Sequence, residues 1–302
     1  MPIPRSFRIP FSLTLLIIFL ACQNFDKPDT SNSSGKSGTL PSEPYPILLT
    51  DDAETLHRFL SVPRRIISLV PSATQTLLSM GLRNSLIGRT DFDLATPELS
   101  NLPSVGEGLN PDLEILLSLE PDLVIGFAGE SNPSITEHLD NSHITYFMIR
   151  PEKLEDVLEI INKLSVITDR EAIGDSIIMG INTALEIVQQ KVANKPRPRI
   201  AYLLGGEPPW VAGPNTYIHQ IIVTGGGQNV FEDLEHEYAP VSLEEFFVRN
   251  IDLILSTENT YIPDKLKVFR AITLPSSVEI PGPELGEAIL EIARFIHPQS
   301  FP

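Results

Sequence analysis

The sequence predicts an α/β protein of two Rossmann-like lobes with parallel sheets, joined by a single long bridging helix. Three observations predict this fold. Short β-branched apolar runs alternate with helical patterns over residues 64–148 and again over 200–297, as in parallel sheets wound with helices. Between them, residues 169–192 carry an apolar side chain at every third or fourth position. The third observation is an internal repeat.

The repeat pairs residues 113–126 with residues 243–256 without a gap. Both copies begin with Leu-Glu, share Asp-Leu at their centre, and mostly match apolar with apolar elsewhere. Each has the pattern of a short helix, a turn and a buried strand. Glu114 and Glu244 fall on the first helical turn, where the helix dipole favours an exposed carboxylate. The repeat therefore predicts two similar lobes that present an acidic residue at equivalent places.

The charge balance excludes some classes of partner. The net charge of the 302 residues is −17, so there is no basic field to attract nucleic acid or an anionic membrane surface. The single cysteine excludes a disulfide within the chain, which leaves stability to the apolar cores. We expect a monomer that binds no nucleic acid.

The N-terminal stretch has the pattern of an export signal. Two arginines precede an apolar run, 11–21, that ends at Cys22 and is too short for a comfortable transmembrane helix. The last four residues of this stretch resemble a bacterial lipobox. We expect a lipoprotein signal peptide over 1–21, lipidation at Cys22, and a flexible polar tether over 22–46. A plainly cleaved signal or an uncleaved anchor is the alternative.

We assign residues 47–150 to the N-terminal lobe, beginning with a segment, 47–63, that could hold an edge hairpin. Four strands and three helices follow in alternation, the first helix opened by a capping box at Ser72–Gln75. The expected strands are 66–70, 86–88, 123–125 and 144–148. The expected helices end near Gly81, begin near Asn110 with Pro111 in their first turn, and cover 134–139.

Residues 151–196 form the predicted helical hinge. One helix begins at Pro151, and a capping box at Thr168–Glu171 precedes the long helix. At ~1.5 Å per residue, a helix of about 24 residues is roughly 36 Å long and can bridge two lobes. Residues 197–302 are assigned to the C-terminal lobe. It is expected to contain strands at 200–204, 253–255 and 272–274 and helices at 217–224, 243–248, 264–270 and 283–297.

The residues needed for catalysis are poorly represented. The chain has no dinucleotide fingerprint, Walker lysine or nucleophile elbow, and its six histidines do not pair at a metal-ligand spacing. Asp91 and Asp93 flank Phe92 and could do acid/base chemistry, and His236 could assist a ligand, but loop roles are favoured for all three. We expect no enzyme, no metal and no resident cofactor.

Four aromatic residues, in contrast, fall at or beyond strand ends. Phe92 and Phe127 follow strands of the first lobe, while Trp210 and Tyr238 lie in loops of the second. Ligands of open α/β sheets bind beyond the carboxyl ends of the strands. Aromatic faces on both rims predict a cleft for a large, flat, partly apolar ligand.

Four segments resemble a known family: residues 67–74, 121–125, 208–210 and 226–231. Through them, and over about residues 64–297, the chain resembles the class III substrate-binding proteins that bind cobalamin and ferric siderophores for ABC importers. The Pro-Pro-aromatic segment at 208–210 points to the cobalamin-binding members. Two departures are the absence of a pocket tryptophan near Gly106 and a changed loop at 276–281.

The resemblance implies a ligand between two lobes and one docking glutamate on each lobe, Glu114 and Glu244, for arginines of an ABC permease dimer. The implied ligand-binding residues are Ser72, Phe92, Gly106, Trp210 and Tyr238, to which the strand-end pattern adds Phe127.

We therefore expect an exported, membrane-anchored lipoprotein, facing the periplasm or the cell exterior, that captures cobalamin or a related corrinoid as a transported ligand. Its membrane contact is through the N-terminal lipid only. A ferric siderophore or haem is the alternative ligand, although such anionic ligands need basic residues and Arg89 is the main one in the cleft loops. The alternative from another class is an exported enzyme that acts on small metabolites.

Overall fold

The computed structural model describes residues 45–129 and 133–301. The predicted signal peptide, Cys22 and nearly all of the tether lie outside the described residues. Within the described part of the chain, no helix is both long and apolar enough to cross a membrane.

The first lobe is a four-stranded parallel sheet in the order β4-β3-β5-β6. Its central strands are buried on both faces, which explains why they read as continuous apolar runs. A separate antiparallel hairpin precedes the sheet, as the sequence allowed. The elements are β1 (Ile47–Thr50), β2 (Leu56–Phe59), β3 (Ile66–Ser68), α1 (Pro71–Ser79), β4 (Leu86–Gly88), the 3₁₀ helix η2 (Asp91–Ala95), α2 (Leu113–Ser118), β5 (Leu123–Phe127), α3 (Pro133–Asn141) and β6 (Tyr146–Ile149).

The second lobe contains a six-stranded sheet whose parallel core is β9-β7-β11-β12, of which β7, β11 and β12 were predicted and β9 was not. Strands β8 and β10 extend it as an antiparallel edge that the sequence did not predict. The chain reverses after β7 at Gly205 and Gly206, which both have positive φ. The elements are β7 (Arg199–Gly205), β8 (Trp210–Ala212), α6 (Tyr217–Thr224), β9 (Gln228–Asn229), β10 (Tyr238–Pro240), α7 (Leu243–Val248), β11 (Leu253–Thr257), η4 (Asp264–Val268), β12 (Ala271–Leu274) and η5 (Ser276–Glu279).

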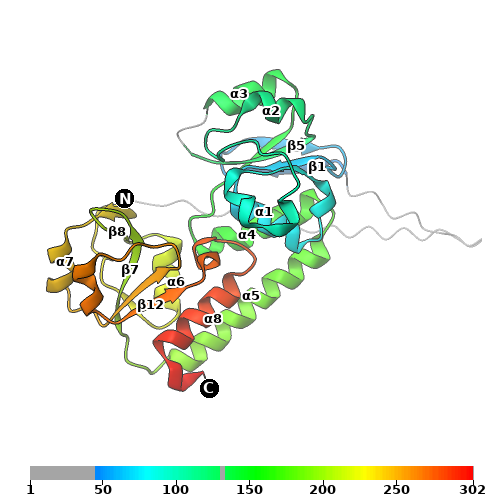
Figure 1. Cartoon of the computed structure of the whole chain (residues 1–302). Helices are drawn as coiled ribbons and strands as arrows, with labels where there is room; N and C mark the ends of the chain where they lie inside the picture. Colours follow the sequence, from blue (N-terminus) through cyan, green and yellow to red (C-terminus); the bar gives the residue numbers. More distant parts are fainter. Residues whose placement is uncertain (1–44, 130–132, 302) are drawn as a thin grey trace, which may run out of the picture. The chain divides into compact units, whose positions relative to one another are not determined.

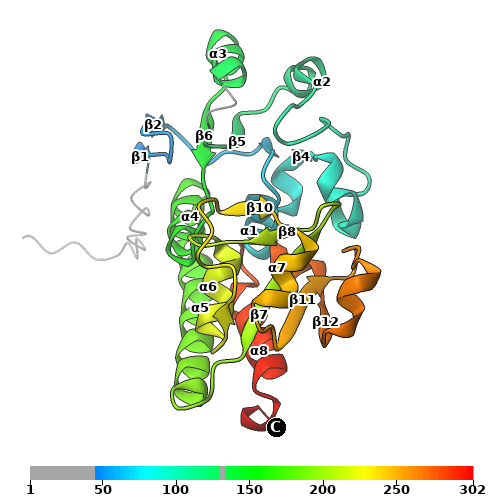
Figure 2. The same cartoon turned by 90° about the vertical axis from the view of Figure 1, so that its left-hand side faces the viewer.

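Helices α4 (Leu154–Ile167), α5 (Glu171–Val192) and α8 (Leu285–Ile296) form the helical layer. Helix α5 has 22 residues and is therefore ~33 Å long. It packs against α4 and against α8, which runs beside it in both views (Figures 1 and 2). Glycine permits both contacts: a Cβ at Gly174 would lie 2.5 Å from the Ser165 Cβ, and one at Gly286 would lie 3.1 Å from the Ala184 Cβ.

The predicted capping boxes are both wrong. Helix α1 begins at Pro71, whose fixed φ suits the first helical position, so Ser72 lies inside the first turn rather than at the cap. The Thr168 hydroxyl instead donates to the Leu164 carbonyl at the end of α4. Pro111 precedes α2, and the Asp112 side chain caps the helix by accepting the Ile115 N–H.

In both copies of the repeat, the aspartate before the strand accepts backbone N–H groups from the start of a neighbouring strand. In the first copy, the Asp122 carboxylate accepts the N–H groups of Arg64 and Arg65 at 2.8 and 2.9 Å. In the second, the Asp252 carboxylate accepts the Arg199 N–H at 2.8 Å. The guanidinium groups of Arg65 and Arg199 donate to carbonyls just beyond the ends of α2 and α7, where cations are favoured.

Backbone conformation repeats as well. Glu120 and Asn250 occupy equivalent positions after these helices, and both adopt positive φ, 45° and 50°. The internal repeat is therefore a structural repeat in helix, turn and strand.

Candidate functional site

Trp210 and Tyr238 lie on the antiparallel edge of the second lobe. Trp210 on β8 pairs with Pro240 on β10, and Tyr238 pairs with Ala212. Because residues two apart on a strand share a face, both aromatic side chains lie on the same face of this edge. Each is 44% exposed, which is high for rings of this size. The pair offers an amphipathic aromatic surface to a ligand.

Phe92 is held out by the turn that follows β4. Asp93 is buried and caps this turn, because its carboxylate accepts both the N–H and the hydroxyl of Thr90, at 3.1 and 2.7 Å. The Gly106 carbonyl accepts the Asp91 N–H at 2.9 Å. Asp91 and Asp93 therefore have structural partners, and Phe92 between them is exposed. The role of Gly106 here is to position the backbone of the turn.

Ser72 and Phe127 are less accessible than the sequence suggested. Phe127 ends β5 and is half-buried against the core. Ser72 is buried, and its Oγ has no hydrogen-bond partner. Its backbone faces the loop after η5, since a Cβ at Gly282 would lie 3.5 Å from the Ser72 carbonyl oxygen. Strand ends of the first lobe thus meet a loop of the second.

A pocket of about 110 Å³ lies at this meeting of lobes. It combines a polar residue of α1 with the 277–284 loop. Its lining residues are Gln75, Ser277, Ile280, Gly282, Pro283 and Glu284.

Glu279 adds a half-buried carboxyl group to the strand ends of the second lobe. It accepts the hydroxyls of Tyr202 and Thr257 at 3.1 and 3.3 Å. Burial raises the pKa of Glu279, although these two hydrogen bonds oppose the rise. Burial, with Glu237, Glu152 and Glu279 nearby, raises the pKa of Tyr238 to about 12, so its phenol stays neutral. This side of the site is acidic and phenolic.

The arginines that follow first-lobe strands are already engaged. Arg89, after β4, donates to the Thr90 carbonyl at 3.0 Å and lies 3.9 Å from Asp91. Arg150, after β6, donates to the Ala128 carbonyl at 2.7 Å and lies 3.9 Å from Glu152. Each guanidinium is therefore partly engaged within the chain, and the buried Arg89 Nε has no hydrogen-bond partner among the described residues.

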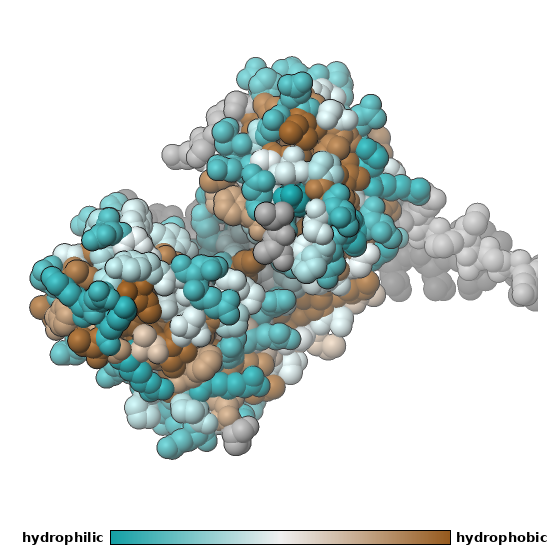
Figure 3. Space-filling model, viewed as in Figure 1, coloured by the Kyte–Doolittle hydropathy of each residue, from teal (hydrophilic) through white to brown (hydrophobic). Residues whose placement is uncertain are grey.

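Glu114 and Glu244 lie where the repeat predicted, each exposed on the first turn of its helix. Hydrogen bonds from its own backbone and from the Ser242 side chain lower the pKa of Glu244 and keep it ionised. On the face shown in Figure 3, apolar residues lie among hydrophilic ones around α7. The docking role of both glutamates is treated below as a proposal.

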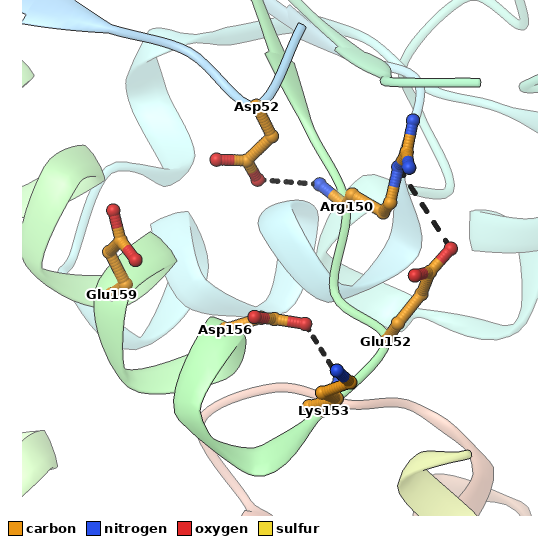
Figure 4. Close-up of a pocket in the computed structure, with 6 residues that line it drawn as sticks. All are labelled: Asp52, Arg150, Glu152, Lys153, Asp156 and Glu159. Carbon is orange, nitrogen blue, oxygen red and sulfur yellow. Dashed lines mark hydrogen bonds and ion pairs between the residues drawn. The ribbon is translucent and has the colours of Figure 1, made fainter. Parts of the chain in front are cut away.

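A second pocket, of about 220 Å³, lies between the first hairpin and the start of α4 (Figure 4). Asp52 accepts the Arg150 N–H at 2.7 Å and the Lys163 ammonium at 2.9 Å. Asp156 accepts the Lys153 N–H at 2.9 Å and thereby caps α4. These contacts tie the hairpin to the hinge, which is a structural task. Among the described residues, no group of three or more His, Cys, Asp or Glu is arranged to hold a metal ion.

The structure thus brings some predicted residues together and adds others. Trp210 and Tyr238 share one face, and Ser72 meets the 277–284 loop. Glu279 and Tyr202 were not singled out from the sequence. The signal for Glu279 was its place just after a parallel strand, where ligands bind.

Comparison with known proteins gives the family. The pattern of the periplasmic binding protein family matches residues 66–270. A cobalamin-binding protein of Halobacterium salinarum is 27% identical over 242 residues, which are 78% of this chain and 64% of that relative. This chain thus spans less than two thirds of that relative's length.

Solved structures share the fold. The vitamin B12-binding protein BtuF of Vibrio cholerae superposes with a TM-score of 0.68 at 21% identity, covering 80% of this chain and 99% of BtuF. The haem-binding protein RhuT of Roseiflexus sp. RS-1 gives the same TM-score and identity, covering 78% of this chain and 99% of RhuT. The names of both structures describe periplasmic binding proteins. The chain belongs to the periplasmic binding protein family.

Proposed function

We propose that this exported protein captures cobalamin or a related corrinoid between its two lobes and delivers it to an ABC import permease. The observation that carries the ligand is the pairing of Trp210 and Tyr238 on one exposed face beside the acidic, phenolic strand ends. Stacking on these rings and burial between lobes suit a large, neutral, partly apolar macrocycle. The cobalamin-binding relative supports the same choice.

Haem is the competing ligand, because a haem-binding protein shares the fold. Haem carries two carboxylates, and burying them without cations costs free energy. Arg89 and Arg150 each donate to a carbonyl of the chain and lie 3.9 Å from one of its carboxylates, and Glu279 would repel an anion. The charge of the site therefore favours the corrinoid over haem or an anionic ferric siderophore.

Delivery uses Glu114 and Glu244 as charged docking points for arginines of the permease dimer, and their effect weakens with salt. Cys22 carries the lipid that holds the protein at the membrane. Ligand binding needs only a small hinge motion, because α5 continues unbroken between its contacts with α4 and α8.

The ligand is tested by fluorescence titration of the protein starting at residue 23. Trp210 is the only tryptophan, so quenching reports on the site directly. We expect saturable one-to-one quenching by cyanocobalamin, confirmed by calorimetry, and none by haem or a ferric siderophore. Trp210→Phe should remove the signal and weaken calorimetric binding. Saturable binding of haem or the siderophore instead would contradict the choice of cobalamin as the ligand and would leave the fold and family unchanged.

Docking is tested with the double variant Glu114→Ala/Glu244→Ala. We expect it to abolish cobalamin uptake into vesicles that contain the permease, with unchanged cobalamin affinity in calorimetry. An equal fall in ligand affinity would contradict the docking role.

A further inference from the structure

An exposed apolar surface lies beside Glu244 on the second lobe. It consists of Phe247 and Val248 at the end of α7 and of Val268 and Phe269 at the end of η4; we name these four residues the α7 patch. Phe247, Val248 and Val268 are 52%, 71% and 74% exposed. The ring centroids of Phe247 and Phe269 lie 5.3 Å apart, so the patch residues of α7 and those at the end of η4 are in contact through these two rings. Contiguous exposed apolar residues of this kind mark interaction sites in soluble proteins.

Helical geometry joins the patch to the carboxylate. Phe247 and Val248 follow Glu244 by three and four residues, which places all three side chains on one face of α7. Glu244 is fully solvated and ionised. The combined surface therefore fits a partner that offers apolar side chains next to a cation.

The first lobe lacks this surface at the equivalent place. In the repeat, Leu117 corresponds to Phe247 and Ser118 to Val248. Leu117 is half-buried, and Ser118 is polar and donates to the Ile115 carbonyl at 2.7 Å. A carboxylate is common to both lobes, and Ile115 beside Glu114 is 38% exposed. Of the two repeated helices, however, only α7 presents an exposed aromatic residue, and its Phe247 and Val248 are 52% and 71% exposed.

We propose that docking on the permease is asymmetric: the α7 patch is the main contact and seats against apolar side chains that flank the cation which pairs with Glu244. This inference rests on the proposed function and goes beyond it, since it ranks the two lobes. The apolar contact is not screened by salt, whereas the pairs at Glu114 and Glu244 are. The second lobe thus retains its contact with the permease at an ionic strength that loosens the first.

The test uses the full chain and the permease dimer of its importer in lipid nanodiscs, with affinity measured by surface plasmon resonance at two salt concentrations. We expect Phe247→Ser/Val248→Ser to weaken binding at least tenfold, about 1.4 kcal/mol, at both salt concentrations. The matched control is Leu56→Ser/Leu60→Ser, two similarly exposed apolar residues in and after β2, which should bind as wild type. Ser118→Val should strengthen binding by extending the first-lobe surface.

The outcomes separate this inference from the proposed function. Wild-type chain that binds cobalamin and not the permease would overturn delivery itself. Wild-type binding with no difference between the α7-patch variant and the control would overturn only the asymmetry. A wild-type dimer in analytical ultracentrifugation that Phe247→Ser/Val248→Ser converts to a monomer would assign the patch to a second copy of the chain and also overturn the inference.

Discussion

Helices α2 and α7 occupy equivalent places in the two lobes, yet they differ in what surrounds the shared glutamate. Both begin with Leu-Glu, and both are followed by a residue with positive φ and an aspartate that accepts backbone N–H groups. The differences are confined to other positions, where α7 carries larger apolar side chains and an added arginine network. The two lobes therefore share the backbone geometry of the helix, turn and strand, but the surfaces around Glu114 and Glu244 carry different side chains.

The arginine network shows how the second copy accommodates its larger groups. Arg249, which corresponds to Leu119, pairs with Glu245 at 2.9 Å, binds Asp233, and lies 4.8 Å from the centre of the Phe231 ring. Phe231 in turn packs edge-on against Phe246 at 5.3 Å. The second lobe therefore couples α7 to the loop after β9, and the first lobe has no such cation at that position.

The largest expected effect comes from the core residues that anchor the two helices. Leu116 and Phe246 are equivalent in the repeat, and both are fully buried. We expect Phe246→Ala to lower the free energy of unfolding by about 4 kcal/mol and Leu116→Ala by about 3 kcal/mol, because the phenyl ring leaves the larger cavity. Urea unfolding followed by circular dichroism measures both. A loss below about 1 kcal/mol at either position would contradict the packing.

The aspartates that close the two copies should differ by less. Asp122 accepts two backbone N–H groups and Asp252 one. We expect Asp122→Ala to cost about 2 kcal/mol and Asp252→Ala about 1 kcal/mol in the same unfolding measurement. Asp122→Asn retains one acceptor oxygen and should lose about half as much as Asp122→Ala. Equal costs for the two alanine variants would mean that the two closures are energetically alike.

The smallest effect is a difference in pH dependence between the strand ends of the lobes. Burial raises the folded-state pKa of Glu279, so the folded chain holds this proton more tightly than the unfolded chain. The stability that this bound proton contributes is therefore present below pH 4.5 and is lost as the pH rises above it. The loss in unfolding free energy should be less than about 1 kcal/mol, because water still screens the carboxyl group.

Replacing Glu279 with Gln should flatten the fall in stability between pH 4 and pH 7. Glu152→Gln, between β6 and α4, should flatten it less, since Arg150 opposes the rise that burial causes in the Glu152 pKa. Unfolding free energies of both variants at the two pH values measure this difference. A steeper fall in Glu279→Gln would contradict the sign.

Much of the fold follows from local sequence, and the site follows only in part. The alternation of apolar runs and helical patterns predicted the parallel core strands, and the repeat predicted where Glu114 and Glu244 lie. The face shared by Trp210 and Tyr238 could not be predicted, because β8 and β10 have three residues each and show no period-two pattern. Their pairing depends on contacts distant in sequence.

Ser72 and Glu279 show a second limit. Ser72 has the sequence of a helix cap, but the proline before it starts the helix one residue earlier and buries its hydroxyl. Glu279 looks like a surface carboxylate in the sequence, and it becomes half-buried and hydrogen-bonded only because Tyr202 and Thr257 come from two other strands of the sheet. Burial and partners of this kind are properties of the assembled lobes.

The close glycine contacts of α5 bear on how a ligand would be released. Gly174 and Gly286 let α4 and α8 pack closely against α5, so we expect the three helices to form a rigid layer that resists bending. Separating the lobes then requires bending this helical layer, which costs free energy. On the proposed function, the permease supplies that free energy when it holds both docking helices, and ligand release is a force-dependent step at the membrane. Gly286→Ala would push α8 slightly away from α5, because the added Cβ would lie 3.1 Å from the Ala184 Cβ. The looser packing should make the layer more flexible and accelerate spontaneous ligand dissociation, measured by stopped flow.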